Sequence, residues 1–436
     1  MIPLMLLLAV GGLMQAARTF TADTSIAGTE LAFGYLLLSA YFTGKIFNRF
    51  GAPKLTGYLF SGIISGSFVL GLVTKDMGHS LGVVQDTASA IIALEAGAEL
   101  QFSKIRPVAK TLRAMTVFAA IGAMFALSAV MFLIRPLLPS IFDGFDTVQS
   151  LAICFAVGVA LSAKSPAVVM ALLAETRADG PLSRVVLATV VVGDLAVIVV
   201  FSVALALTGA AIGGGVDVVE TSLHVGWQLI GSMVFGVLIG LLIGQFLVSV
   251  KKGASLFALM ICVVVAEIGA RVSLDPLIVL LTAGIWLRNF SRADATDLFR
   301  NFEAAQLPVF LVFFALAGSH LDIYTLWALL LPVGILAAVR AGSFYVGGKF
   351  ACRVTGAEAV VTKYAWFGFV PQAGLALALA SVLRATFPQF GEGASVLLLG
   401  VVGLNEAIAP VILRRMLIKT GEAGKKQGVD FAAGGH

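Results

Sequence analysis

The sequence predicts an all-α polytopic membrane protein, and three observations lead to this fold class. Of the 436 residues, 59% are hydrophobic and only 12% are charged, and a soluble domain of that composition cannot bury its apolar surface. Long apolar runs of about 20 residues recur along the chain, which is the length that a helix needs to cross a bilayer. These runs are continuous instead of alternating, so they do not fit the strands of a membrane β-barrel.

The apolar runs predict about 13–14 transmembrane helices and leave little chain for a soluble domain. In order, the expected helices cover residues 2–17, 27–47, 54–73, 82–100, 111–135, 148–174, 182–208, 223–249, 254–270, 275–289, 307–321, 326–351, 364–384 and 393–417. The chain accordingly divides into five parts, which are 1–26, 27–208, 209–253, 254–418 and 419–436.

The first part, residues 1–26, is either an extra N-terminal helix or a signal-like segment. Its apolar run ends in small residues, as a signal peptide does, but no basic residue precedes that run. We prefer a helix that is retained in the protein, and cleavage stays open. Either answer leaves the orientation of the later helices unchanged.

Residues 27–208 form a first repeat of about six helices, and its last two helices contain charges at membrane depth. The fifth is interrupted at "SAKSPA", where Lys164 and Pro166 stand in an otherwise apolar run. The sixth reads "VVVGDLAVIVV", with Asp194 in its middle. Charges within membrane-spanning segments are costly and commonly mark functional sites.

Residues 254–418 form a second repeat with the same two features in the same order. A single linker helix within 209–253 inverts this repeat relative to the first. Its fifth helix is interrupted at "FGFVPQAG", and its sixth contains an acid in "GLNEAIAPVIL". Interrupted helices at matching positions of inverted repeats indicate a transport site near the membrane midplane. Prolines that merely kink packed helices are the simpler alternative.

The uneven distribution of basic residues predicts the orientation of the chain. The net charge is +5, and most of the 29 Lys and Arg lie in alternate loops, such as 104–113, and in the tail. This positive-inside pattern places the C-terminus in the cytoplasm, with a bacterial inner (plasma) membrane as the expected location. It also accounts for the positive charge without a nucleic-acid partner. The glycine-rich, basic tail 419–436 is expected to be disordered.

Asp194 is the central candidate for an ion- and proton-binding residue. A carboxylate near the midplane can bind either a proton or a metal cation, and this competition is enough to couple two gradients. Unwinding at the first break would expose backbone carbonyls and the hydroxyls of Ser162 and Ser165. Gln372 offers an amide at the second break. The expected metal is therefore a transient Na⁺ or K⁺ at Asp194, and no cofactor is expected.

The other buried polar residues have structural alternatives. Asp194 could form an ion pair with Lys164 or Arg340, and Lys164 could occupy the space of the cation or be displaced by it. Glu95 could pair with Arg340. The remaining supporting candidates lie around the two breaks or on the helices after them: Gly193, Pro166, Pro371, Asn405 and Glu406.

Six segments, taken in order, resemble the monovalent cation:proton antiporter superfamily, which includes bacterial sodium/proton and potassium/proton exchangers. They are "PKLTGYLFSGIISG", "SAKSPAVVMALLAE", "VVVGDLAVIVV", "PVFLVFFALAGSHLD", "FGFVPQAGLALALA" and "GLNEAIAPVIL". Each is weak alone, but their order and spacing over about 27–417 make a strong signal.

The resemblance implies a homodimer with a dimerisation domain and an antiporter core in which the interrupted helices cross. The core would move like an elevator and transport the ion or proton on an essential aspartate, which Asp194 matches. The matching crossover residues are Ser162, Lys164, Ser165 and Pro166 in the first break and Pro371 and Gln372 in the second. Three features depart from the family pattern. Gly193 stands where an Asn, Asp or Gln is usual, Lys164 stands where a Thr or Ser is usual, and the helix 307–321 lacks the Lys or Arg that some members use as a partner for the acidic pair.

The leading function is therefore exchange of a monovalent cation, Na⁺ or K⁺, for H⁺. The alternative is a proton-coupled transporter of the same fold for an anionic or organic substrate, which Lys164 could bind. An enzyme is not expected: "VVGD" differs from the "GxGD" of intramembrane aspartyl proteases, and the chain contains no "HExxH".

Overall fold

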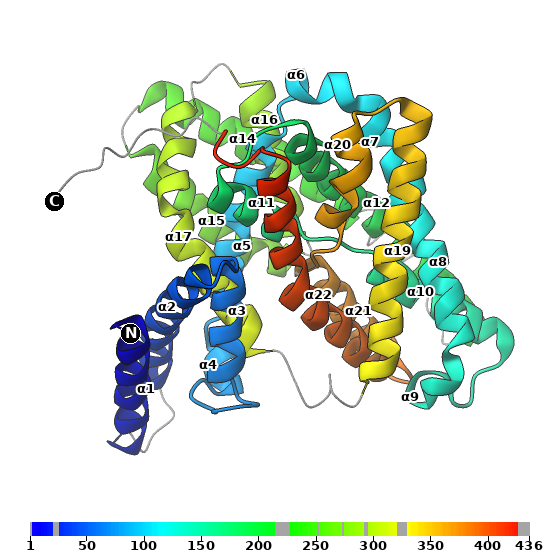
Figure 1. Cartoon of the computed structure of the whole chain (residues 1–436), viewed down its shortest axis with the longest axis horizontal. Helices are drawn as coiled ribbons and strands as arrows, with labels where there is room; N and C mark the ends of the chain where they lie inside the picture. The colour runs from blue at the N-terminus through cyan, green and yellow to red at the C-terminus, as the bar shows by residue number, and fades with distance from the viewer. Residues whose placement is uncertain are drawn as a thin grey trace.

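The computed structural model describes residues 2–20, 26–213, 227–250, 253–272, 274–291, 295–320, 329–372 and 374–425. Every regular element in this part of the chain is helical (Figure 1). The apolar composition thus produces the all-α architecture that it predicts, because helices satisfy all their backbone hydrogen bonds internally.

The helices of the first half are α1 (Ile2–Phe20), α2 (Ile26–Arg49), α3 (Lys54–Ser65), α4 (Lys75–Ser80), α5 (Gly82–Glu99), α6 (Phe102–Ile105), η1 (Arg106–Val108), α7 (Ala109–Met115), η2 (Thr116–Ile121), α8 (Gly122–Leu133), η3 (Arg135–Leu137), α9 (Pro139–Phe142), α10 (Thr147–Leu161), α11 (Pro166–Thr176) and α12 (Pro181–Ile212). Those that follow are η4 (Trp227–Gly231), α14 (Ser232–Ser249), α15 (Ala254–Val272), α16 (Pro276–Asn289), α17 (Thr296–Ser319), α19 (Leu330–Thr355), α20 (Ala359–Tyr364), η5 (Ala365–Phe369), α21 (Gly374–Thr386) and α22 (Gly391–Lys419).

Among the described residues, each predicted apolar run overlaps a helix or a broken pair of helices. Within the described residues, six helices are long and apolar enough to cross a membrane, or up to seven if a bent pair counts as one span. The chain is therefore a polytopic membrane protein. In this part of the chain, several of the expected 13–14 runs form helices too short to be counted as full spans. The run 54–73, for example, gives a helix of 12 residues that ends at Ser65.

The helices group into two bundles, which we call the panel bundle and the core bundle. The panel bundle contains α1–α3, α5 and α14–α17, and the core bundle contains α7–α12 and α19–α22. Figure 1 shows α1, α2 and α17 on one side of the molecule and α8, α10 and α19 on the other. Within the panel bundle, α5 and α16 pack backbone to backbone. A Cβ at Gly97 would collide with the Leu281 carbonyl, and a Cβ at Gly284 would collide with the Leu94 carbonyl, so both positions require glycine. These two helices form a closely packed wall.

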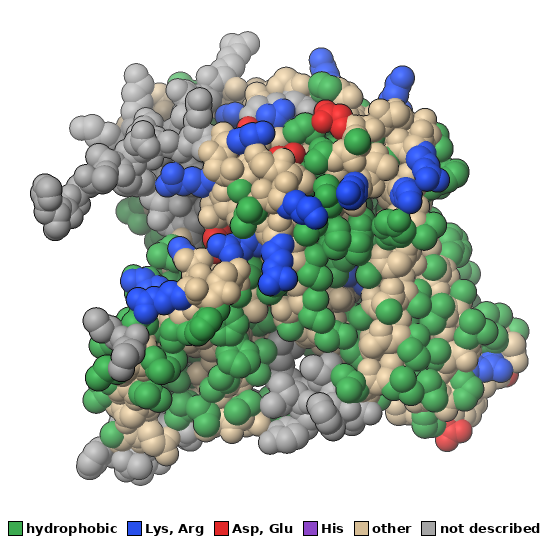
Figure 2. Space-filling model, viewed as in Figure 1, with side chains coloured by type: hydrophobic (Ala, Val, Ile, Leu, Met, Phe, Trp, Pro, Cys, Tyr) green, Lys and Arg blue, Asp and Glu red, His purple; other side chains and the backbone are tan. Residues whose placement is uncertain are grey.

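Basic side chains gather at one end of the molecule, which we call the basic end. Figure 2 shows Lys and Arg concentrated over the upper part of this face, around the regions of α7, α20 and the ends of α19 and α22 in Figure 1. The lower part of the same face is mostly hydrophobic. The asymmetry agrees with the positive-inside pattern expected from the sequence.

The two bundles are joined at the basic end by a polar network. From α22 of the core, Arg414 donates to the Gly51 carbonyl at 2.7 Å and to Asn48 Oδ1 at 3.3 Å. From α11, Glu175 accepts a hydrogen bond from the Lys54 amide at 3.0 Å. Arg414 Nε lies 3.8 Å from Glu175 Oε1. The loop between α2 and α3 is thereby attached to two core helices.

The expectation of a disordered tail from residue 419 is wrong for its first part. The chain is described to Lys425, and Glu422 is buried. Its carboxylate accepts hydrogen bonds from the Leu182 and Ser183 amides, both at 2.8 Å. These are the first free amides of α12, which need acceptors. Residues 426–436 lie outside the described part of the chain, as does most of the link between α12 and η4.

Candidate functional site

The first helix break lies between α10 and α11 and is built by a serine and a proline. α10 ends at Leu161, and α11 starts at Pro166, whose missing N–H and fixed φ suit the first position of a helix. Ser165 Oγ accepts a hydrogen bond from the Val168 amide at 3.1 Å and caps the new helix. The second break separates η5 from α21 and contains Pro371 and Gln372. Both predicted interruptions are therefore present.

Arg340 on α19 joins the two breaks. Its guanidinium is fully buried and donates from Nε to the Leu161 carbonyl at 2.8 Å and from Nη2 to the Ala163 carbonyl at 2.5 Å. It also donates to the carbonyls of Val370 at 2.6 Å and Phe369 at 3.2 Å. Interrupted helices leave carbonyls without partners, and the five donors of a guanidinium can satisfy several at once.

This arrangement differs from the expected ion pairs of Arg340. In the described part of the chain, no salt bridge joins its side chain to Asp194 or to Glu95. Glu95 is buried on α5 in the panel bundle, whereas Arg340 lies in the core bundle. The charge of Arg340 is instead offset by the dipoles of the unwound backbone.

Gln372 belongs to the same structural network. Its Nε2 donates to the Leu161 carbonyl at 3.0 Å, and its Oε1 accepts from Asn405 Nδ2 at 2.9 Å. The amide that the sequence suggested as an ion ligand is thus engaged in holding the two breaks together. Ser162 is similar, because its hydroxyl donates to the Val159 carbonyl at 2.7 Å.

Asp194 lies on α12 beside the first break. Its side chain accepts a hydrogen bond at Oδ1 from the backbone amide of Lys164 at 3.0 Å, and the residue is only 7% exposed. The unwound segment thus positions the carboxylate through its backbone. Asp194 is in the interior of the 32-residue helix α12, so it does not cap that helix.

The side chain of Lys164 turns away from this hydrogen bond and lies against Gly193. Its Nζ is buried and has no hydrogen-bond partner among the described residues, and no salt bridge joins it to Asp194 within that part of the chain. A Cβ at Gly193 would lie 2.8 Å from Nζ. The ammonium also lies 5.6 Å from the centre of the Phe344 ring, within reach of a cation–π interaction. Gly193 therefore provides the space that Lys164 occupies.

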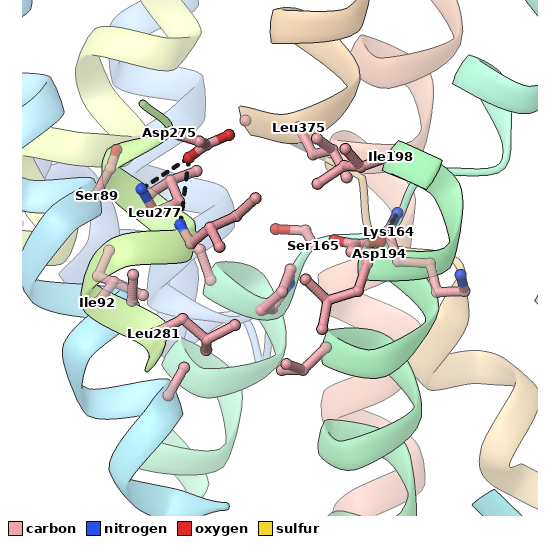
Figure 3. A pocket seen from close by; sticks show the side chains of 18 of the residues that line it. Ser89, Ile92, Lys164, Ser165, Asp194, Ile198, Asp275, Leu277, Leu281 and Leu375 are labelled. Carbon is pink, nitrogen blue, oxygen red and sulfur yellow. Dashed lines mark hydrogen bonds between the residues drawn. The ribbon is translucent and has the colours of Figure 1, made fainter. Parts of the chain in front are cut away.

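A cavity of about 100 Å³ separates the core bundle from the panel bundle at this point. Asp194, Lys164 and Ser165 line it from the core, and Ser89 and Asp275 line it from the panel wall of α5 and α16. Figure 3 shows these two sets of side chains on opposite sides of the space. Most other lining residues are apolar, so the cavity is a low-dielectric space with a few polar groups.

The structure brings together only some of the residues that the sequence suggested. Asp194, Lys164, Ser165 and Pro166 line the cavity, whereas Glu95, Glu406 and Asn405 do not, although all three are buried. Asp275 lines the cavity and was missed. Its signal was an acid directly before the proline that starts an apolar run, "SLDPLIV", which is typical of a helix N-cap.

The cavity lining includes oxygen groups of the kind that alkali cations accept as ligands. Among the described residues, no group of three or more His, Cys, Asp or Glu side chains is placed to hold a metal ion. The Asp194 carboxylate and the Ser165 hydroxyl are the oxygen groups that line the cavity from the core bundle. Such a set suits a weakly held alkali cation that must leave again.

The whole-chain comparisons agree with this architecture. Residues 35–419 match the family described as "Sodium/hydrogen exchanger, transmembrane". A curated relative, the probable Na⁺/H⁺ antiporter 3 of Methanocaldococcus jannaschii, is 22% identical over 402 residues, which are 88% of this chain and 96% of the relative. Two structures of the sodium proton antiporter MjNhaP1 from the same organism share the fold, with TM-scores of 0.67 and 0.73 at 14% identity. They cover 90% and 91% of this chain, and 98% of their own length is matched.

Proposed function

The chain belongs to the sodium/hydrogen exchanger family of transmembrane proteins, and from this premise we propose that it exchanges Na⁺ or K⁺ for H⁺ on the single carboxylate of Asp194. The observation that supports this assignment most strongly is the position of Asp194. It is an almost fully buried acid that lines a cavity between two helical bundles, beside an unwound segment. A proton and a cation compete for one carboxylate there, so neither gradient can be used without the other.

Alternating access would come from movement of the core bundle against the panel bundle, in the manner of an elevator. Two features of the bundles support this movement. The core bundle contains both breaks and Arg340, and the panel bundle contains the closely packed wall of α5 and α16. The matching breaks in 27–208 and 254–418 support two inverted repeats. We further propose a homodimer, with the C-terminus and the basic end facing the cytoplasm of a bacterial inner membrane.

Lys164 decides the stoichiometry in this proposal. If its ammonium stays charged throughout the cycle, Asp194 exchanges one proton for one cation and transport is electroneutral. If Lys164 also loses a proton when the cation binds, two protons move per cation and transport is electrogenic. We favour the electroneutral scheme, because loss of the Lys164 proton would leave the negative charge of Asp194 without a nearby positive charge to offset it.

A second candidate function is proton-coupled transport of an anionic or organic substrate by the same fold. The specific observation in its favour is that Lys164 lines the cavity while its Nζ is buried without a hydrogen-bond partner in the described residues. An anionic group entering the cavity would find a positive charge there. The two candidates differ in whether an alkali cation alone drives proton movement.

Proton flux in proteoliposomes tests the two candidates directly. A pH-sensitive dye inside the vesicles should report proton movement when Na⁺ or K⁺ is added outside, and none when choline is added. A flux rate that does not change when the membrane potential is clamped at different values supports the electroneutral scheme. Absence of Na⁺-, K⁺- and Li⁺-dependent flux, in protein that is shown to be folded, would favour the second candidate.

A further inference from the structure

We propose that Asp275 is a docking site for hydrated monovalent cations, on the panel wall that faces Asp194 across the cavity. This inference rests on the proposed cation/proton exchange and adds an entry step to it. The cation would first meet Asp275 and then pass to Asp194, where it competes with the proton. Asp275 does not take part in the exchange itself.

The geometry of Asp275 leaves one carboxylate oxygen for a ligand. Asp275 is the N-cap of α16, and its Oδ1 accepts hydrogen bonds from the amides of Leu277 at 2.8 Å and Ile278 at 3.3 Å. In Figure 3 both dashed lines end on the same oxygen, and the other oxygen points away from them. Two backbone contacts fix the side chain, so the second oxygen is held in place on the cavity wall.

The charges that line the cavity explain why Asp275 would attract a cation. The ionisable side chains that line the cavity are Asp194, Lys164 and Asp275, all in the described part of the chain. At the core wall, the ammonium of Lys164 lies beside Gly193 and offsets the charge of Asp194. Attraction of a cation into the cavity therefore depends on the panel wall. A charge on a low-dielectric wall focuses the field into the space that it faces and raises the local concentration of counter-ions.

The simpler interpretation is that Asp275 only caps α16. The two roles can be separated, because Asn caps a helix about as well as Asp but has no charge. Asp275→Asn should keep the hydrogen bonds to Leu277 and Ile278 and remove the attraction. Asp275→Glu should keep the charge. The matched control is Asp76→Asn, which removes an exposed acid on α4 outside the cavity lining.

Cation-dependent proton flux in proteoliposomes tests the proposal, with Na⁺ or K⁺ added to each side of the membrane in separate experiments. For Asp275→Asn we expect the KM for the cation to rise about three- to tenfold, within the range of electrostatic steering, with kcat unchanged. The increase should shrink when inert choline chloride raises the ionic strength. Asp275→Glu and Asp76→Asn should stay within about twofold of the wild type.

An unchanged KM in Asp275→Asn would overturn the docking site, and so would an increase that persists at every ionic strength. If Asp275→Asn fails to fold, Asp275→Ser, which also caps without charge, takes its place. Failure of the proposed exchange gives a different result: wild-type protein would then show no cation-dependent proton flux. Wild-type exchange with a normal Asp275→Asn variant would reject the docking site alone.

Discussion

The backbone amide of Lys164 donates a 3.0 Å hydrogen bond to Oδ1 of Asp194, while the ammonium of the same residue lies against Gly193. The carboxylate is therefore positioned by the unwound backbone and not by the charged side chain. The side chain at position 164 can change without loss of that contact. We therefore expect the Lys164 side chain to act on Asp194 through its charge and not through a hydrogen bond.

Substitutions at Gly193 and Lys164 should be strongly coupled. Gly193→Asn alone places side-chain atoms on the Lys164 ammonium, so we expect it to destabilise the protein by about 1–3 kcal/mol. In a Lys164→Thr background the space is free, and Gly193→Asn should cost much less. A double-mutant cycle followed by thermal unfolding in detergent measures the coupling, which we expect to be at least about 0.5 kcal/mol. Additive effects would show that the two side chains do not share this space.

Arg340 should be essential for the stability of the core bundle. Arg340→Met removes the donors to four carbonyls at the two breaks, and we expect a loss of about 3–5 kcal/mol in the free energy of unfolding, because those carbonyls stay buried without partners. Arg340→Lys should be nearly as unstable as Arg340→Met, because an ammonium cannot reach the same acceptors as a guanidinium fork. The control is Arg353→Met on the exposed end of the same helix, which should change stability by less than about 0.5 kcal/mol. Equal effects of the two Met variants would contradict the role of Arg340.

Glu422 should stabilise the helix that contains Asp194. Its carboxylate accepts from Leu182, Ser183 and the Ser183 hydroxyl, the last at 2.6 Å, and Glu422→Ala leaves these donors buried without acceptors. We expect a loss of about 2 kcal/mol, measured as a lower Tm. A chain shortened after Lys425 should keep its Tm, whereas one shortened after Thr420 should not. If both shortened chains melt alike, the cap contributes nothing.

Breaking the polar network at the basic end should change which side of the membrane the cavity faces. Arg414 Nε and Glu175 Oε2 are buried without hydrogen-bond partners in the described residues, so the network is incompletely satisfied and can separate at low cost. We expect Arg414→Ala to favour the state in which the cavity faces the other side of the membrane. A Ser89→Cys probe in the cavity should then react more slowly, by about fivefold, with an impermeant thiol reagent added on the side from which it reacts without the Arg414 substitution. An unchanged rate would mean that the network does not hold this state.

The helix breaks were predictable from the sequence, because proline and its polar neighbours act locally. The apolar runs likewise predicted the helices, since burial in lipid leaves the backbone no alternative. The partners of Arg340 were not predictable, because its acceptors are backbone carbonyls that any residue provides. The sequence favoured carboxylates for it, and only the folded chain shows that two distant breaks meet at one guanidinium.

The burial of Glu422 and the place of Asp275 in the cavity were not predicted, because both also depend on distant parts of the folded chain. Glu422 stands in a glycine-rich, basic segment with the composition of a disordered tail, and its burial depends on the turn before α12. Asp275 lies at the boundary of an apolar run, where acids are common helix caps. Its place in the cavity follows from the close packing of α5 and α16, which depends on glycines far apart in the sequence.

The most direct measurement for the central claim compares proton flux in wild-type protein and in Asp194→Asn, reconstituted at equal amounts and tested with Na⁺ and K⁺. Asn keeps an oxygen acceptor for the Lys164 amide and removes the charge and the titratable proton. The folded state should therefore survive, and its Tm can be checked alongside. We predict that cation-dependent proton flux is abolished in Asp194→Asn and retained, with altered cation affinity, in Lys164→Thr. Full exchange by Asp194→Asn would contradict the account.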